Sequence, residues 1–292
     1  MAKQLASMIR SGFKALGLDV KRHQAVDPNM ALYRSLYPQD SLEHRRFYNV
    51  GAGLFRHPAW TNIDHYSDWY KGNVTDIDYD LEALTPIPVE TASAEVVYTS
   101  HTVEHITNAA AQNMFNEAFR MLKPGGYFRM TTPNIDLEHR AYRENDRHYF
   151  FWIERYSKQP EMERAKVKTP LNQASIQQIF LLHFASNVST LHSDGAVQRI
   201  SDEELDRVFR ELPYEAALDY CTGKVDLAVH KKYPGNHINW WNKDKAFRML
   251  QQAGFEKIYL SGHGQSFCPV MRDTNYFDNT HPKISLYVEA IR

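Results

Sequence analysis

Apolar residues in the first half of the chain form short runs that alternate with helical patterns. The segments Arg46–Val50, Trp60–Ile63 and Ala94–Thr99 are short, apolar and rich in β-branched or aromatic residues, which predicts β-strands. Residues 111–122 instead repeat apolar side chains at helical spacing, and a further strand is expected at Tyr127–Thr132. Strands that alternate with helices predict a parallel sheet with crossover helices.

The alternation stops after this fourth strand and resumes near the C-terminus. Residues 141–236 show helical patterns without a strong strand, so we expect a mostly helical insertion there. A helix is then expected after Asn242, and strands at Lys257–Leu260 and 284–291. The expected organisation is an N-terminal helical segment (1–45), a core (46–140), a helical insertion or lid (141–236) and the C-terminal part of the core (237–292).

Composition narrows the class of protein. Basic and acidic residues nearly cancel, 34 against 35, which gives no overall field to attract nucleic acid or an anionic membrane. Cys221 and Cys268 do not make a disulfide framework, so we expect a cytoplasmic protein. No apolar run reaches about 18 residues, so no transmembrane segment is expected. Residues 3–17 predict an amphipathic helix that docks on the core or lies on a membrane surface.

A glycine pair and an acidic residue indicate a nucleoside site. Gly51 and Gly53 follow the first strand, and Asp64 ends the second, where a carboxylate can accept hydrogen bonds from ribose hydroxyls. The pattern departs from the dinucleotide fingerprint, because Arg56 occupies the third glycine position and Asp64 comes 13 residues after Gly51. The dinucleotide spacing is about 20 residues. These departures argue against a NAD-dependent oxidoreductase and favour an adenosine ligand without a pyrophosphate.

Five short motifs together resemble those of class I S-adenosylmethionine-dependent methyltransferases. In order they are Val50–Gly53, Asn62–Asp64, Asp80–Leu81, Ser100–His105 and Leu122–Gly126. The resemblance is closest to the small type-11-like branch associated with sugar and surface-polysaccharide modification. It implies an α/β fold, a Rossmann-like seven-stranded, mostly parallel sheet with an antiparallel last strand, interrupted here by the helical insertion. It also implies S-adenosylmethionine as the cofactor.

The resemblance further implies which residues contact the cofactor. They are Gly51 and Gly53 at the methionine part, Asp64 at the ribose, Asp80 and Leu81 at the adenine, and Ser100 and His101 at the methyl end. The acceptor is expected to be a hydroxyl on a sugar, glycan or small metabolite, not a nucleic acid. Whether the chain forms a homo-oligomer stays open. The alternative is a catalytically silent methyltransferase fold that serves as a binding module.

A hydroxyl acceptor needs a base, and histidine is the side chain that titrates near neutrality. His101 has the best placement, directly after the strand Ala94–Thr99, and His237 is the second candidate. The run from His101 to His105 also matches an inverted zinc-protease motif and a metal-ligand set made by His101, Glu104 and His105. We favour the interpretation without a metal, in which Glu104 and His105 cap and orient the following helix.

Overall fold

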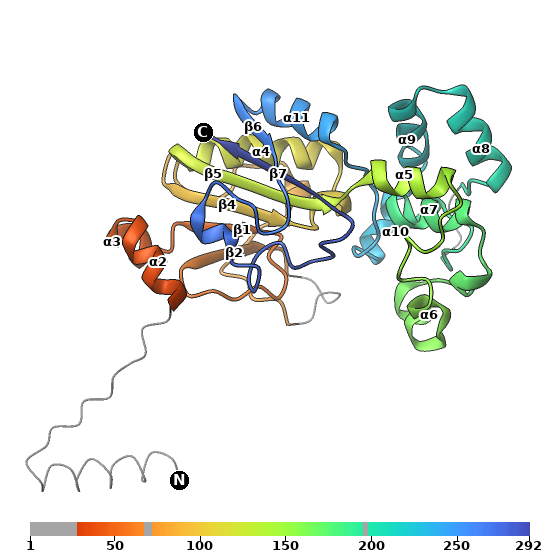
Figure 1. Cartoon of the computed structure of the whole chain (residues 1–292), viewed down its shortest axis with the longest axis horizontal. Coiled ribbons are helices and arrows are strands. Elements are labelled where there is room, and N and C mark those ends of the chain that lie inside the picture. Colours follow the sequence, from red (N-terminus) through yellow and green to blue (C-terminus); the bar gives the residue numbers. More distant parts are fainter. Residues whose placement is uncertain (1–27, 67–71, 195–197) are drawn as a thin grey trace, which may run out of the picture. The chain divides into compact units, whose positions relative to one another are not determined.

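The computed structural model in Figure 1 describes residues 28–66, 72–194 and 198–292. The chain divides into two compact units, Met1–Tyr37 and Pro38–Arg292. In the first unit the described residues form helix α2 (Pro28–Leu36), and the predicted amphipathic helix 3–17 lies outside the described residues. Within the described ranges, no helix has the length and apolar character that crossing a bilayer requires.

A seven-stranded sheet is the centre of the second unit. Its strand order is β3-β2-β1-β4-β5-β7-β6. The strands are β1 (Phe47–Val50), β2 (Trp60–Asp64), β3 (Ile77–Asp78), β4 (Ala94–Ser100), β5 (Leu122–Pro133), β6 (Lys257–Leu260) and β7 (Ser285–Ile291). The strands from β3 to β5 pair in parallel, and β7 pairs antiparallel with both β5 and β6. The predicted Rossmann-like sheet with an antiparallel last strand is therefore confirmed.

The start of β5 differs from the sequence expectation. The structure extends this strand from Tyr127 back to Leu122, through the stretch between the expected helix and the expected strand. Ala94 pairs with Leu122, but Val96 already pairs with Tyr127, so four residues of β5 oppose one residue of β4. Gly125 accommodates this bulge with a φ of +81°. The bulge remains hydrogen-bonded to the chain beyond β7, because the Gly125 N–H donates to the Arg292 carbonyl (2.7 Å).

Helices cover one face of the sheet and gather beyond its carboxyl edge (Figure 1). The α-helices of the second unit are α3 (Gln39–Glu43), α4 (Asn108–Met121), α5 (Ile135–Arg143), α6 (Gln159–Ala165), α7 (Ile176–Phe184), α8 (Asp202–Glu211), α9 (Tyr214–Thr222), α10 (Leu227–Lys232) and α11 (Lys243–Gln252). Helices α4 and α11 pack on the sheet through a core that includes Phe115, Phe128 and Trp241. As predicted, Asn242 caps α11 by accepting a hydrogen bond from the Lys245 N–H (2.9 Å).

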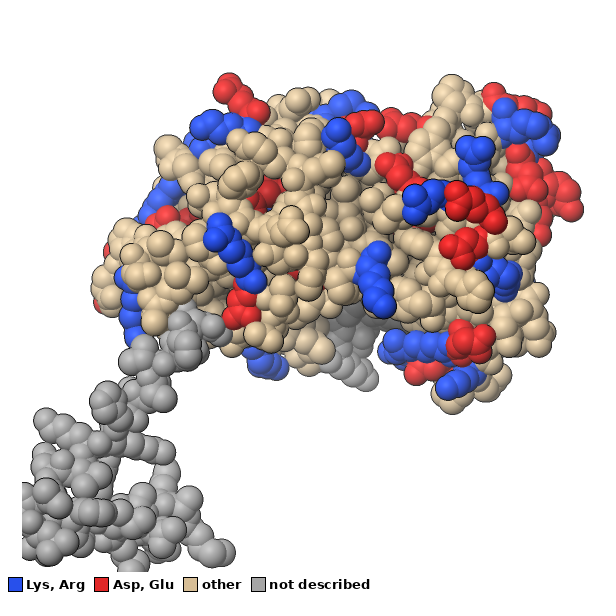
Figure 2. Space-filling view, viewed as in Figure 1, with Lys and Arg blue, Asp and Glu red and all other residues tan. Residues whose placement is uncertain are grey.

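The helices from α5 to α9 enclose a second hydrophobic core. Its buried members include Phe180, Leu181 and Leu218, and it draws in Ile135 and Trp240 from either side of the predicted insertion 141–236. The described part of that stretch contributes helices and only isolated β-bridges to the fold. On the face shown in Figure 2, basic and acidic side chains are interspersed instead of being grouped by sign.

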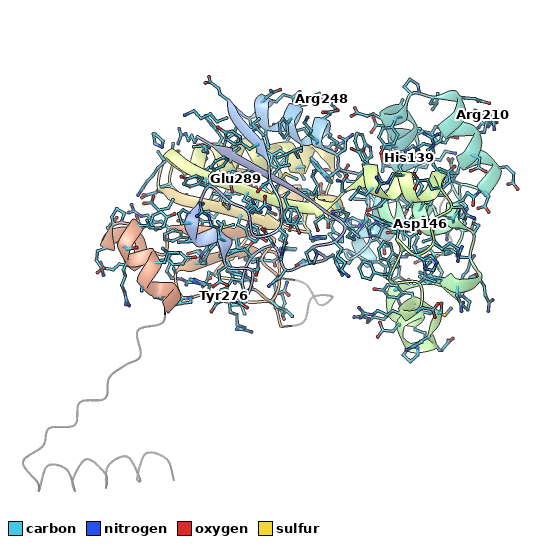
Figure 3. The ribbon with its side chains drawn as sticks, viewed as in Figure 1. His139, Asp146, Arg210, Arg248, Tyr276 and Glu289 are labelled. Atoms are coloured by element: carbon cyan, nitrogen blue, oxygen red, sulfur yellow. The ribbon has the colours of Figure 1, made fainter. Side chains whose placement is uncertain are left out.

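The long loop 261–283 covers the other face of the sheet. Its Phe277 ring lies 5.0 Å from the Trp60 ring and 5.3 Å from the Tyr98 ring. Arg129 of β5, which is fully buried, binds the loop at Asp278 with contacts of 3.0 and 2.5 Å, and lies 3.3 Å from Glu289 of β7. Figure 3 labels Glu289 on β7 within the sheet. One guanidinium thus joins β5 and β7 to the loop 261–283.

Arg129→Met is expected to lower the free energy of unfolding by about 3–5 kcal/mol, because it leaves two buried carboxylates without their cation. Urea unfolding followed by tryptophan fluorescence measures the loss. The control is Arg248→Met, since Arg248 pairs with Glu215 at an exposed site, with 53% and 36% of the side chains accessible. Exposed pairs contribute about 0–1 kcal/mol. Equal losses in the two variants would contradict the assigned role of Arg129.

Candidate active site

The glycine pair follows β1 at the carboxyl edge of the sheet. Gly51 and Gly53 both have positive φ values, +70° and +55°, which side chains other than glycine rarely adopt. A Cβ on Gly51 would clash with the Thr102 side chain, whereas a Cβ on Gly53 would have no heavy atom within 4 Å. Gly51 is therefore required for packing inside the protein, and Gly53 leaves space for another molecule to approach the backbone.

Asp64, at the end of β2, lies against the same glycine turn. One carboxylate oxygen accepts hydrogen bonds from the Gly53 N–H (2.7 Å) and the Asn73 amide (3.1 Å), and the other accepts from the His65 N–H (2.8 Å). Each carboxylate oxygen has two lone pairs, so capacity to accept from a ligand hydroxyl remains. The structure therefore places two predicted cofactor residues, Gly53 and Asp64, in direct contact.

Asp80 and Leu81 begin a short 3-10 helix, Leu81–Ala83, close after β3. The exposed Asp80 accepts a hydrogen bond from the Glu82 N–H (2.9 Å) and so caps this turn. Glu82 in turn accepts from the N–H (2.7 Å) and the hydroxyl (2.9 Å) of Thr107, which caps α4. The predicted adenine segment is thus anchored to the helix that follows β4.

Ser100 ends β4, and His101 follows it in a left-handed conformation with a φ of +51°. Ser100 Oγ is 2.9 Å from Thr131 Oγ1 on the neighbouring strand β5. The imidazole of His101 has a partner at each nitrogen: Nε2 lies 2.8 Å from Ser285 Oγ, and Nδ1 lies 3.1 Å from Glu104 Oε1. This backbone conformation is uncommon for a histidine, and its side chain is held in one position at the edge of the sheet.

Glu104 is a buried carboxylate at the centre of this region, with 1% of the residue exposed. Its Oε2 accepts a hydrogen bond from the Thr132 hydroxyl (3.1 Å). Its backbone carbonyl accepts from the N–H groups of Ile238 (2.8 Å) and Asn239 (3.2 Å), where the chain returns from the helical insertion. These contacts place His237 beside the end of β4.

His237 and His105 lie side by side, with ring centroids 4.6 Å apart. His105 Nδ1 is 3.1 Å from the Asn236 carbonyl, and His237 Nδ1 contacts the His183 carbonyl. One nitrogen of each of these two rings and an oxygen of Glu104 lie within 4.8 Å of one another. The two predicted catalytic histidines, His101 and His237, are therefore both brought next to Glu104.

Burial and neighbouring charges together determine which residues of this cluster are protonated. Burial by itself would raise the pKa of Glu104, but the neighbouring histidines, above all His101, outweigh it and lower that pKa to about 2. Burial lowers the pKa of His105, and burial together with His105 and His183 lowers the pKa of His237. The cluster at neutral pH is therefore one ionised carboxylate beside two neutral imidazoles.

Several residues of this cluster were not identified from the sequence. They are Ser285 of β7, Thr132 of β5 and His183 of α7. Each contacts a residue that is distant in sequence, so no local motif contains both partners. Ser285 is separated from His101 by 184 positions. For Ser285, the sequence offers one indirect indication, the long loop 261–283 that precedes β7. A loop of that length inside a compact domain is usually functional.

A separate cavity of about 970 Å³ lies in the helical insertion. Its lining includes His139 on α5 and Arg210 on α8, both labelled in Figure 3, together with Tyr142 and Asp206. None of the cofactor residues expected from the sequence lines this cavity. His139 therefore belongs to a cavity that is distinct from the glycine turn at Gly53 and Asp64.

Comparison with known proteins gives one match to a family model. Residues 61–130 match the model described as a methyltransferase domain, a segment that runs from β2 to β5. The chain carries an S-adenosylmethionine-dependent methyltransferase domain. The structure adds the seven-stranded sheet and a glycine turn hydrogen-bonded to Asp64. No curated protein matches the sequence significantly.

Solved structures show distant likenesses to the methyltransferase domain. One is described as a possible histamine N-methyltransferase of Thermotoga maritima, with 11% identity and a TM-score of 0.38, covering 90% of this chain and 87% of that chain. A methyltransferase of Mesorhizobium loti has 13% identity, a TM-score of 0.37 and coverages of 90% and 96%. One from Archaeoglobus fulgidus has 10% identity, a TM-score of 0.38 and coverages of 90% and 92%. Likenesses this distant say nothing of the acceptor.

The glycine turn provides a matched pair of stability tests. Gly53→Ala is expected to lower the free energy of unfolding by about 1–2 kcal/mol, the cost of a left-handed backbone at a residue with a Cβ. Gly51→Ala adds the clash with Thr102, worth about 1–3 kcal/mol more. Urea unfolding of both variants measures the difference. A Gly51→Ala loss no larger than that of Gly53→Ala would show that Thr102 does not require the glycine.

Proposed function

We propose that the chain transfers a methyl group from S-adenosylmethionine to a hydroxyl oxygen of a sugar, glycan or small metabolite. The observation that carries this proposal is the position of His101, which lies at the carboxyl end of β4 between Glu104 Oε1 and Ser285 Oγ. Ligands in parallel α/β sheets bind outside the carboxyl ends of the strands. A histidine held there by a carboxylate has the arrangement of a general base.

The residues at the other end of this edge suit the cofactor. Gly53 offers an open backbone, and Asp64 keeps a free lone pair on Oδ1 that can accept from a ribose hydroxyl. When bound, S-adenosylmethionine supplies an electrophilic methyl on a cationic sulfur, and attack by the acceptor oxygen breaks the carbon–sulfur bond to leave S-adenosylhomocysteine. Ser100 and His101, at the end of the central strand β4, are proposed to face this reacting end. Asp80 and Leu81 are proposed to hold the adenine.

His101 is proposed to accept the proton that the acceptor hydroxyl loses. His101 Nδ1 lies 3.1 Å from the ionised Glu104, so the carboxylate favours the tautomer with its proton on Nδ1 and the lone pair on Nε2. That nitrogen lies 2.8 Å from the Ser285 hydroxyl, which also donates to the His281 carbonyl (2.9 Å), so an acceptor hydroxyl would take the place of Ser285 as the partner of Nε2. Glu104 orients the ring and stabilises the imidazolium that forms, the role of a carboxylate beside a histidine base.

The helical insertion is proposed to cover the acceptor. Its helix α7 carries His183, whose carbonyl contacts His237 and whose ring stacks on Trp152 at 4.4 Å. His183 Nδ1 also lies 2.7 Å from the buried carboxylate of Glu138 on α5. These contacts attach the insertion to the cluster around Glu104. An acceptor held under the insertion would therefore lie next to the proposed base.

The proposal is tested by supplying [13C-methyl]S-adenosylmethionine and a set of acceptors to the purified chain. The set comprises sugars, glycans and small metabolites with hydroxyl groups, and matched amines. Carbon-13 NMR separates O-methyl from N-methyl products. O-methylation of a hydroxyl acceptor is the expected result. Transfer to nitrogen alone would overturn the acceptor class, and cofactor binding without turnover on any acceptor would favour the silent binding module.

Asp64→Ala is expected to weaken S-adenosylhomocysteine binding by about 1.5–3 kcal/mol, the scale of charge-assisted hydrogen bonds. Isothermal titration calorimetry measures the affinity. Asp78→Ala is the matched control, because Asp78 pairs with Asp64 in the sheet register but is exposed and accepts from the Tyr66 N–H (3.1 Å). Wild-type affinity in Asp64→Ala would remove Asp64 from the cofactor site.

His101→Gln is expected to lower kcat by about 10²–10⁴-fold, the usual loss when a general base is removed. Its affinity for S-adenosylhomocysteine should stay within a few-fold of wild type, because the base acts on the acceptor. Steady-state kinetics and calorimetry measure the two quantities, with the exposed His44→Gln as the control. An unchanged kcat would transfer the role of base to His237, and a lost cofactor affinity would make His101 a binding residue.

A further inference from the structure

The rings of His105 and His237, both near Glu104, are held in the same tautomer. His105 and His237 each direct Nδ1 at a backbone carbonyl, of Asn236 and His183 respectively. A carbonyl only accepts hydrogen bonds, so the proton of each neutral ring is on Nδ1 and the lone pair is on Nε2. Histidines that bind metals are usually fixed in this way by a bond from the other ring nitrogen.

Glu104 directs an oxygen toward the same point. Its Oε2 is satisfied by Thr132, but Oε1 is fully buried and, among the described residues, receives no well-directed hydrogen bond, although His101 Nδ1 is 3.1 Å away. His105 Nε2 is 4.0 Å from this oxygen. A buried carboxylate oxygen without a donor is costly, which calls for a cation or a strong donor beside it.

We propose that Glu104, His105 and His237 form a binding site for a zinc-class divalent cation. Three lone pairs, one from each residue, converge within 4.8 Å of one another. Two imidazoles and one carboxylate are the ligand set of open zinc sites, which leave a fourth position for water or substrate. Mg²⁺ and Ca²⁺ prefer ligand sets made of oxygen, so this donor set selects against them.

The spacing of the three residues fits this cation after small side-chain rotations. Zinc–ligand bonds of about 2.0–2.2 Å place neighbouring ligand atoms roughly 3–3.5 Å apart. The 4.0 Å between Glu104 Oε1 and His105 Nε2 is close to that value. His101 is not one of the ligands, because its Nε2 is directed at Ser285. The ligand set therefore differs from the His101, Glu104 and His105 set that the sequence motif presents.

The position of the site indicates its role, and this step rests on the proposed function. Glu104 Oε1 also faces His101 Nδ1, so the cation would lie next to the base at the end of β4. A hydroxyl oxygen of the acceptor would occupy the open position. A bound cation lowers the pKa of such an oxygen and fixes its orientation.

The test uses the full chain after chelator treatment, titrated with Co²⁺ as a spectroscopic probe and with Zn²⁺ in calorimetry. We expect one equivalent of cation per chain, with visible cobalt absorption bands of a low-coordinate site. His105→Asn and His237→Asn keep a donor near the Nδ1 position and remove the Nε2 ligand, and Glu104→Gln removes the charge. Each should weaken binding by at least about 10-fold, whereas the exposed His44→Asn should not.

Two results would overturn the site: the absence of stoichiometric cation binding by the folded wild-type chain, or wild-type binding in all three ligand variants. Circular dichroism of each variant shows whether it is folded, and His237→Asn, whose hydrogen bond is retained, provides the test if Glu104→Gln does not fold. The measurements need no acceptor. Cation binding without methyl transfer would therefore refute the proposed function alone, and methyl transfer without cation binding would refute the metal site alone.

Discussion

The burial of one carboxylate constrains the whole edge of the sheet. Glu104 has 1% of its surface exposed, and a buried charge is tolerated only where partners surround it. Its side chain contacts Thr132 and His101, and its backbone carbonyl accepts from Ile238 and Asn239. These partners come from β5, from the end of β4 and from the segment that returns from the insertion. The need to satisfy Glu104 therefore positions both candidate catalytic histidines.

The proposed cofactor side and the proposed acceptor side of this edge are built on different physical principles. On the cofactor side, positive φ values and the Gly53–Asp64 hydrogen bond bring backbone and carboxylate together without burial. On the acceptor side, burial lowers the pKa of His105 and His237 and so keeps them neutral, whereas the neighbouring histidines, above all His101, overcome the effect of burial on Glu104 and keep it ionised. Neutral imidazoles beside an ionised carboxylate can bind a cation, and the proposed cation site uses that property.

The loop 261–283 replaces the helices that could cover the second face of the sheet. Beyond the 3-10 helix Pro269–Arg272, this loop has little regular structure, so it can cover the sheet only if its polar groups are satisfied. Arg129 satisfies several of them, through Asp278 and the carbonyl of Gly262 (2.9 Å). Phe277 fills the apolar part of the same face. Because the loop leads directly into Ser285, its anchoring also determines where the partner of His101 lies.

The sequence by itself determined the order of strands and helices and the local motifs. Apolar periodicity and glycine positions are properties of neighbouring residues, so β1, β2, β4 and the turn at Gly51 follow from them. The contact between Gly53 and Asp64 also follows, because parallel strands end at one edge. Only the tertiary structure decided that His237 joins His105, that Ser285 joins His101 and that Leu122 starts β5. These depend on pairings over many positions, and local patterns carry no information about which distant side chain satisfies a buried charge.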